Sequence, residues 1–234
     1  PVSFLGFFDD IRKLMAQENQ VSASLFSFNS KGACPECKGK GKVTIELVFM
    51  DPVTTTCEAC NGKRYSEEAL SYQYHGKNIM EILNLTVEEA SEFFAEHKKI
   101  AKKINAMMEV GLSYLSLGQP LSTLSGGELQ RIKLAKHLDQ KGNIYLLDEP
   151  TTGLHASDVK NIMKLLDRFV VQGNTVIVIE HNLDVIKTAD YIIDIGPEGG
   201  DKGGTVVASG TPEEIAANEK SYTGKYIAAI LNKK

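Results

Sequence analysis

The sequence predicts an α/β protein with a mostly parallel sheet that helices cover on both faces, a small cysteine-containing module and a helical region. Two observations carry this prediction. In the second half of the 234 residues, short runs of Val, Ile and Leu alternate with amphipathic segments, which is the pattern of buried parallel strands joined by helices. In the first half, all four cysteines fall between positions 34 and 60, as two Cys-x-x-Cys pairs.

These patterns divide the chain into four expected parts. Residues 1–30 form a partial segment of a longer domain, because apolar residues begin at once at helical spacing with no capping residue before them. Residues 31–65 form the cysteine module, residues 66–123 a helical linker, and residues 124–234 the α/β core.

The first half contains one expected strand and one long expected helix. The strand is Val43–Phe49, within the cysteine module. The helix begins after Thr86, because Thr86 and Glu89 have the spacing of a capping box, and it ends near Gly111. Its lysines predict a solvated face, and its Met and Phe residues predict a buried stripe.

The second half contains the alternating elements of the α/β core. A capping box of Ser125 and Glu128 begins one helix, and Thr211 with Pro212 and Glu214 begins another. The other expected elements are strands at Ile144–Leu147, Thr175–Ile179, Tyr191–Ile195 and Thr205–Ala208, and helices at Val159–Val171 and Leu183–Ala189.

Composition, charge and the length of the apolar runs exclude two classes of protein: one with an overall basic field and one that spans a membrane. Hydrophobic residues at 42% and charged residues at 24% are ordinary for a globular protein, and the net charge of -4 gives no overall basic field. Any contact with nucleic acid must therefore come from a local patch. The apolar run Val176–Ile179 is far too short to span a bilayer, and no basic-then-apolar leader opens the sequence. We expect a soluble, cytoplasmic protein without membrane contact.

The four cysteines have the spacing of a structural zinc site: Cys34, Cys37, Cys57 and Cys60. Four thiolates suit tetrahedral Zn²⁺, and four protein ligands leave no position for a catalytic water. Two disulfides or four free thiols are the alternative. The same module carries cations that could contact a DNA backbone, namely Lys31, Lys38, Lys40, Lys42, Lys63 and Arg64.

A phosphate-binding helix tip is predicted at Ser125-Gly126-Gly127. Glycine in a helix costs about 1 kcal/mol relative to alanine, so two glycines in a first turn favour a backbone that something must approach closely. Free N–H groups and the positive end of the helix dipole favour phosphate at that place. The alternative is simply a well-capped helix.

Acidic residues and a histidine end two neighbouring strands. Asp148 and Glu149 follow the first strand, where side chains project into the ligand crevice of a parallel sheet. We expect Asp148 to hold Mg²⁺ through water and Glu149 to orient and deprotonate an attacking water. His181 follows the next strand and can reach the γ-phosphate and that water. Glu180 is either a second polar contact or a solvated cap.

No Gly-x-x-x-x-Gly-Lys-Ser/Thr phosphate loop occurs in the sequence. The motifs present therefore predict half of an ATP-binding machine, in which the nucleotide is clamped between two half-sites. We expect the 234 residues alone to bind ATP weakly and to turn it over negligibly.

Taken together, these motifs resemble the UvrA family of excinuclease components, the damage-recognition ATPases of bacterial nucleotide excision repair. His155 supports this resemblance, because transporter ATPases usually carry Asp there. The matching stretches run nearly end to end: Phe7–Arg12, Phe26–Asn29, Cys60–Tyr65, Gly118–Pro120, Leu124–Glu128, Asp148–His155, Glu180–Lys187 and Gly196–Asp201.

The resemblance implies the C-terminal part of an ABC-type P-loop ATPase with a zinc module, and the roles that follow from the family pattern. Ser125, Gly126 and Gly127 are then the ABC signature, Asp148 and Glu149 belong to Walker B, and His181 is the switch histidine. It also implies ATP and Mg²⁺ as cofactors, and damaged DNA, a UvrB-type helicase and a second copy as partners. The Walker A strand of the family lies between the strands at 175–179 and 191–195, so we expect either a gap there or pairing with another chain.

Departures from the family pattern favour a divergent paralogue, of the kind linked to tolerance of DNA-binding drugs, as an alternative. Ala33 stands where Arg is usual, Leu129 where Ala is common, and the Leu138–Asn143 connection is short. A non-catalytic zinc-stabilised module is a further alternative, because Cys34–Gly41 also fits the repeat of DnaJ-type chaperones. Those modules have four such repeats and no Asp-Glu-Pro strand. A transporter ATPase is disfavoured by His155 and by the cysteine module.

Overall fold

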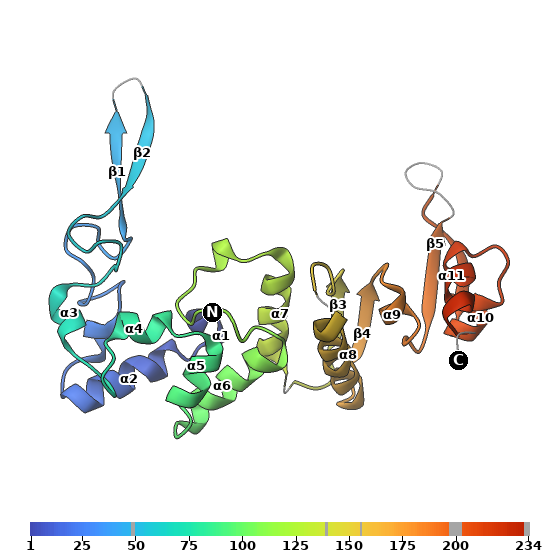
Figure 1. The fold of residues 1–234 in the computed structure, drawn as a ribbon, viewed down its shortest axis with the longest axis horizontal. Helices are drawn as coiled ribbons and strands as arrows, with labels where there is room; N and C mark the ends of the chain where they lie inside the picture. Colours follow the sequence, from blue (N-terminus) through green and yellow to red (C-terminus); the bar gives the residue numbers. More distant parts are fainter. Residues whose placement is uncertain (48–49, 139, 155, 197–202, 232–234) are drawn as a thin grey trace. The chain divides into compact units, whose positions relative to one another are not determined.

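Two compact units make up the chain, Pro1–Leu138 and Asp139–Lys234 (Figure 1). The computed structural model describes residues 1–47, 50–138, 140–154, 156–196 and 203–231. His155 and residues 197–201 of the expected motifs lie outside these ranges. The helix expected to open the α/β core falls in the first unit, and the four-part division of the chain stays a prediction.

The first unit is mainly helical. Phe7, Ile11 and Met15 are almost fully buried in it, which confirms the helical start of the chain. Ile104 and Met107 from the lysine-rich region are buried in the same unit. The helices are α1 (Val2–Leu5), α2 (Phe8–Asn19), α3 (Glu67–Ser71), α4 (Ile79–Asn84), α5 (Val87–Phe93), α6 (Lys98–Glu109) and α7 (Gly126–His137), with short 3-10 helices η1 (Ala23–Phe26) and η2 (Leu121–Thr123).

The single helix expected from Thr86 to Gly111 is wrong, because α5 and α6 are separate helices. The predicted capping box of Thr86 and Glu89 is confirmed at the start of α5. The break at Phe94–His97 coincides with an aromatic cluster, in which the Tyr74 hydroxyl lies 2.5 Å from Nε2 of His97. Packing of these rings with Tyr74, 23 residues away in sequence, overrides local helix propensity.

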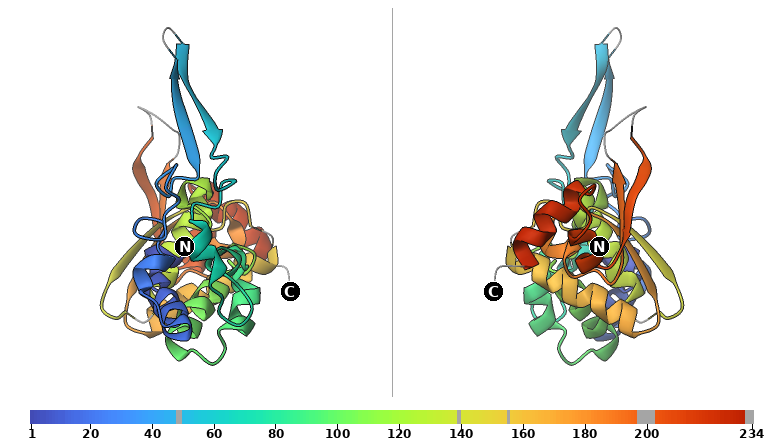
Figure 2. Two further views of the ribbon diagram at one scale, coloured as in Figure 1. Left: turned by 90° about the vertical axis from the view of Figure 1, so that its left-hand side faces the viewer. Right: turned by 90° about the vertical axis from the view of Figure 1, so that its right-hand side faces the viewer.

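A two-stranded hairpin extends from the cysteine module, and Figure 2 shows it as a narrow ribbon projecting from its unit. The strands are β1 (Lys42–Leu47) and β2 (Met50–Thr56), paired antiparallel. The predicted strand is confirmed as far as Leu47, and its last two positions lie outside the described residues. The sequence did not reveal β2, because Pro52 and a run of threonines hide any alternation.

In the second unit, β3 (Ile144–Asp148) and β4 (Thr175–Ile179) form the parallel pair that the sequence predicts. Helix α8 (Ala156–Val171) covers one face of this pair, and its Phe169 ring lies 4.6 Å from the Tyr145 ring. The opposite face is exposed, with Ile144 at 73% and Leu146 at 68%. The expectation of a strand buried on both faces is therefore wrong in this chain.

The last two strands form a separate hairpin of β5 (Ile192–Gly196) and β6 (Thr205–Gly210). They pair antiparallel, which corrects the expectation of parallel strands in this part. Among the described residues, β4 and β5 are not hydrogen-bonded to one another. Helices α9 (Leu183–Ile186), α10 (Pro212–Ala216) and α11 (Tyr222–Leu231) complete the unit, and the predicted capping box at Thr211 begins α10.

The α/β class is confirmed by these elements. Across the described ranges, none of the helices combines the length and the apolar composition that crossing a membrane requires.

Candidate metal and nucleotide sites

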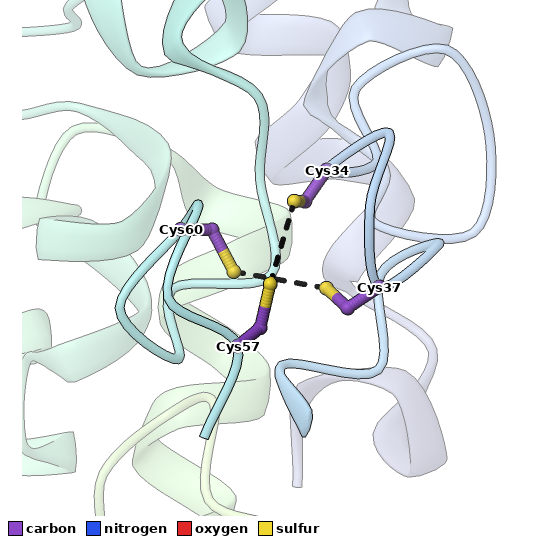
Figure 3. Close-up of side chains that lie close together, drawn as sticks. All are labelled: Cys34, Cys37, Cys57 and Cys60. Atoms are coloured by element: carbon purple, nitrogen blue, oxygen red, sulfur yellow. Dashed lines mark hydrogen bonds between the residues drawn. The ribbon is translucent and has the colours of Figure 1, made fainter. Parts of the chain in front are cut away.

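The four cysteines come together at the base of the hairpin, with their sulfurs turned toward one another (Figure 3). All four side chains are buried, and all ligand atoms lie within 4.8 Å of one another. None forms a disulfide. The sulfurs of Cys34 and Cys57 are 4.0 Å apart, and those of Cys37 and Cys60 are 3.7 Å apart.

These sulfur distances fit a tetrahedral zinc ion. Zn–S bonds of about 2.3 Å place the corners of a tetrahedron about 3.8 Å apart, whereas a disulfide requires about 2.05 Å. Gly39, Gly41 and Gly62 have positive φ angles and make the tight turns of the two knuckles. The Gly41 amide donates to the Cys37 sulfur at 3.2 Å.

The acid–base properties of the cluster also suit a cation. Burial raises the pKa of Cys37, but the Gly41 amide and the neighbouring thiols outweigh it and lower this pKa to about 7. Burial and the neighbouring thiols raise the pKa of Cys60 to about 12. Four thiolates packed this closely repel one another, and a divalent ion would balance their charge.

The predicted DNA-contacting cations separate into two groups. The five lysines of this set are exposed on the cysteine module. Arg64 is half-buried and holds the module together, because its Nε donates to the Gly39 carbonyl at 2.8 Å and its guanidinium lies 3.5 Å from the Phe28 ring centre. The sequence did not reveal this role, since it depends on contacts that span 25 and 36 positions.

Ser125 caps α7, and the capping box with Glu128 is confirmed. The Ser125 amide donates to Glu128 at 2.7 Å, and the Glu128 amide donates back to the Ser125 hydroxyl at 3.3 Å. The Tyr114 hydroxyl also donates to Glu128 at 2.5 Å, and this hydrogen bond lowers the pKa of Glu128. Sequence reasoning missed Tyr114, which precedes the tip by eleven residues.

The glycine of this tip is not required by packing within the chain. A Cβ atom built on Gly126 would meet no atom within 4 Å. Ser125 and Gly126 are both exposed. The tip is therefore accessible to a ligand. No described contact explains why a glycine stands at position 126.

Asp148, Glu149 and His181 come together at the carboxyl ends of β3 and β4. Asp148 pairs with Ile179 in the strand register, and the Glu149 amide donates to the Ile179 carbonyl at 2.9 Å. Oε1 of Glu149 lies 3.6 Å from Nδ1 of His181. All three polar side chains are on exposed residues, so this edge is accessible to a ligand.

Glu149 has an unusual backbone conformation for its residue type. Its φ of 44° lies in the left-handed region, which is uncommon outside glycine and concentrates at functional sites. The Thr152 hydroxyl donates to the Glu149 carboxylate at 3.0 Å. The carboxylate thus accepts a hydrogen bond from Thr152 and lies near the His181 ring.

Glu180, whose role the sequence left open, is half-buried and well bonded. It accepts hydrogen bonds from Thr151 in the loop after β3 and from the backbone after β4. The structure therefore brings together Asp148, Glu149, Glu180 and His181 at one edge. The signature residues at the α7 tip belong to the other unit.

Comparisons with known proteins agree with these motifs. The ABC transporter family matches residues 38–152. UvrABC system protein A of Staphylococcus aureus (strain COL) is 53% identical over 242 residues, covering all of this chain and 26% of that protein. The Aquifex aeolicus protein of the same name is 54% identical with the same coverage. The crystal structure of UvrA2 from Deinococcus radiodurans matches with a TM-score of 0.88 and 46% identity, over 97% of this chain and 29% of that one.

The chain thus spans about a quarter of the length of the curated relatives it matches.

Proposed function

We propose that this chain, which is similar to UvrA proteins along its whole length, is the C-terminal part of a UvrA-type ATPase that acts on damaged DNA in nucleotide excision repair. In this proposal the chain contributes the signature tip, the Walker B edge, the switch histidine and a zinc module. A phosphate loop comes from another part of the complete protein.

The arrangement of Glu149 and His181 carries this proposal. Two side chains suited to proton transfer lie 3.6 Å apart at the ends of adjacent parallel strands, where ligands of such sheets bind. ATP with Mg²⁺ supplies the phosphoryl group and the charge neutralisation. Asp148 would hold the Mg²⁺ ion, Glu149 would accept the proton of the attacking water at its carboxylate, and the His181 ring would donate a hydrogen bond toward the γ-phosphate.

The exposed α7 tip supports a composite nucleotide site. A Cβ atom at Gly126 would meet none of the described atoms within 4 Å outside its own helix and chain neighbours, and such an open helix N-terminus suits a phosphate supplied from elsewhere. We propose that Ser125, Gly126 and Gly127 contact the triphosphate bound by a second nucleotide-binding body. In this proposal the second body is a second copy of the complete protein.

The cysteine module supports a DNA-binding role. Cys34, Cys37, Cys57 and Cys60 would hold a structural Zn²⁺ ion at the base of the hairpin, and the five lysines of the module are exposed. We propose that these lysines contact the phosphate backbone of DNA, while a UvrB-type helicase is the protein partner. Arg64 is assigned to the module's own stability instead.

The proposal is tested by Glu149→Gln in the complete protein. ATP turnover is expected to fall by about 10²- to 10⁴-fold, the contribution of a general base, while ATP binding is retained because the substitution keeps the side-chain shape. Glu213→Gln, an exposed glutamate in the first turn of α10, is the matched control and should leave turnover unchanged. Wild-type turnover in Glu149→Gln would contradict the assignment.

A further inference from the structure

Glu180 is the acceptor of four hydrogen bonds from two loops. Its Oε1 accepts from the Thr151 amide at 3.0 Å and from the Thr151 hydroxyl at 2.5 Å. Its Oε2 accepts from the amides of His181 at 3.0 Å and Asn182 at 3.1 Å. Both oxygens of the carboxylate are therefore used, and each binds two donors.

The carboxylate of Glu180 joins the segment after β3, which follows Glu149, to the segment after β4, which contains His181. Thr151 lies two residues after Glu149 and is buried, with 6% of its surface exposed. The donors on the other side include the backbone of His181 itself. Glu180 thus ties the segment that follows the acidic residue to the segment that contains the histidine.

A cap for the following helix does not explain Glu180. Helix α9 is capped by Asn182, whose side chain accepts from the Asp184 amide at 3.0 Å. Nor is Glu180 a solvated surface charge, because it is half-buried and paired on both oxygens. Its contacts with Thr151, 29 positions away in sequence, are tertiary contacts.

We propose that Glu180 is a positioning residue that fixes Glu149 and His181 relative to one another for ATP hydrolysis, an inference that rests on the proposed ATPase function. Glu180 does not touch the reacting atoms. It acts through Thr151 on one side and through the His181 backbone on the other, and so holds the 3.6 Å approach of the two catalytic groups.

The geometry demands a carboxylate at this place. Burial raises the pKa of Glu180, but hydrogen bonds from Thr151, Asn182 and His181 outweigh it and lower this pKa below its ordinary value. A carboxylate offers only acceptors, whereas a glutamine amide would point an NH₂ group at two of the four donors. Glu180→Gln is therefore disruptive although it preserves size.

The test uses Glu180→Gln in the complete protein, with ATP turnover and ATP affinity measured separately. A displacement of catalytic groups by about 1 Å costs about 10²-fold in rate, so we expect kcat to fall by about that factor and KM for ATP to stay within about twofold. Unchanged kcat would overturn the proposal. So would an equal loss of turnover and ATP affinity, because that result indicates general unfolding of the edge.

A double variant separates positioning from an independent effect. If Glu180 acts through Glu149, the variant with both Glu149→Gln and Glu180→Gln should be no slower than Glu149→Gln alone. Multiplied losses would overturn the proposal. If wild type does not hydrolyse ATP, or if Glu149→Gln retains turnover, the proposed function itself fails, and this outcome is distinct from the failure of Glu180 alone.

Thr151 provides a second route if Glu180→Gln does not fold. Thr151→Val removes the hydroxyl donor and keeps the shape, while Thr151→Ser keeps the hydroxyl. We expect about a tenfold lower kcat in Thr151→Val, since one hydrogen bond to a charged group is lost, and near wild-type kcat in Thr151→Ser. Equal rates in the two variants would contradict the role of this hydrogen bond.

Discussion

The cysteine cluster and the acidic edge at Asp148 differ in how much of each candidate site the described residues of this chain supply. The cluster takes all its ligands from one short segment, buries them, and spaces their sulfurs for one ion. The edge is open, and the sheet face beside it leaves Ile144 and Leu146 largely exposed. The cysteine cluster has all its candidate ligands within the described residues, whereas the proposed nucleotide site at the acidic edge would need groups from a second nucleotide-binding body.

The largest expected effect is at the closed site. Cys57→Ser should reduce bound zinc from about one ion per chain to almost none and unfold the cysteine module, because zinc binding contributes about 10–16 kcal/mol to folding in comparable peptides. Metal analysis and circular dichroism under reducing conditions measure this. Glu58→Gln, the exposed neighbouring residue, is the control and should keep its zinc. Wild-type protein without bound zinc would show that the cysteine cluster is not a zinc site.

A smaller but still large effect is expected at the open site. The 234 residues alone, which contain no phosphate loop, should bind ATP with a Kd weaker than about 1 mM, or about -4 kcal/mol. Isothermal titration of the isolated chain measures this, and the complete protein is the positive control. Micromolar affinity in the isolated chain would show that the edge is complete by itself, against our account.

The smallest expected effect concerns the surface of the cysteine module. Replacing Lys38 and Lys40 together by Gln should weaken DNA binding by about threefold to tenfold and lower the salt slope of log K by about two, because each neutralised phosphate contributes about 0.9. The pair Lys98 and Lys99, exposed at the start of α6, is the matched control. If both double variants lose the same affinity, the module has no special part in DNA contact.

Local signals in the sequence were sufficient for much of the fold. Capping boxes at Thr86, Ser125 and Thr211 depend only on residues three positions apart, and all three are confirmed. The strand Thr175–Ile179 has the predicted bounds, because its continuous β-branched run begins after a turn and ends at polar residues. The clustering of the four cysteines was equally predictable, since the spacing of the two knuckles is a local pattern.

Features that depend on distant contacts could not be predicted in this way. The partner of a strand and its direction depend on residues far away in the sequence. Hydrophobic periodicity therefore did not predict the antiparallel pairing of β5 and β6 or the exposed face of β3. The roles of Arg64 and Glu180 likewise arise from partners 25 to 36 positions away. A residue type alone does not identify such partners.

The most direct test of the composite site is Gly126→Asp in the complete protein, with stability and ATP turnover measured on the same sample. A Cβ atom here would meet none of the described atoms within 4 Å outside its own helix and chain neighbours, and a carboxylate at a helix N-terminus contributes about 0.3–1 kcal/mol of stability. The account predicts an unfolding midpoint that is not lowered, together with at least about 100-fold slower turnover, because the carboxylate repels the triphosphate. Undiminished turnover in this variant would contradict the claim that the α7 tip receives a nucleotide.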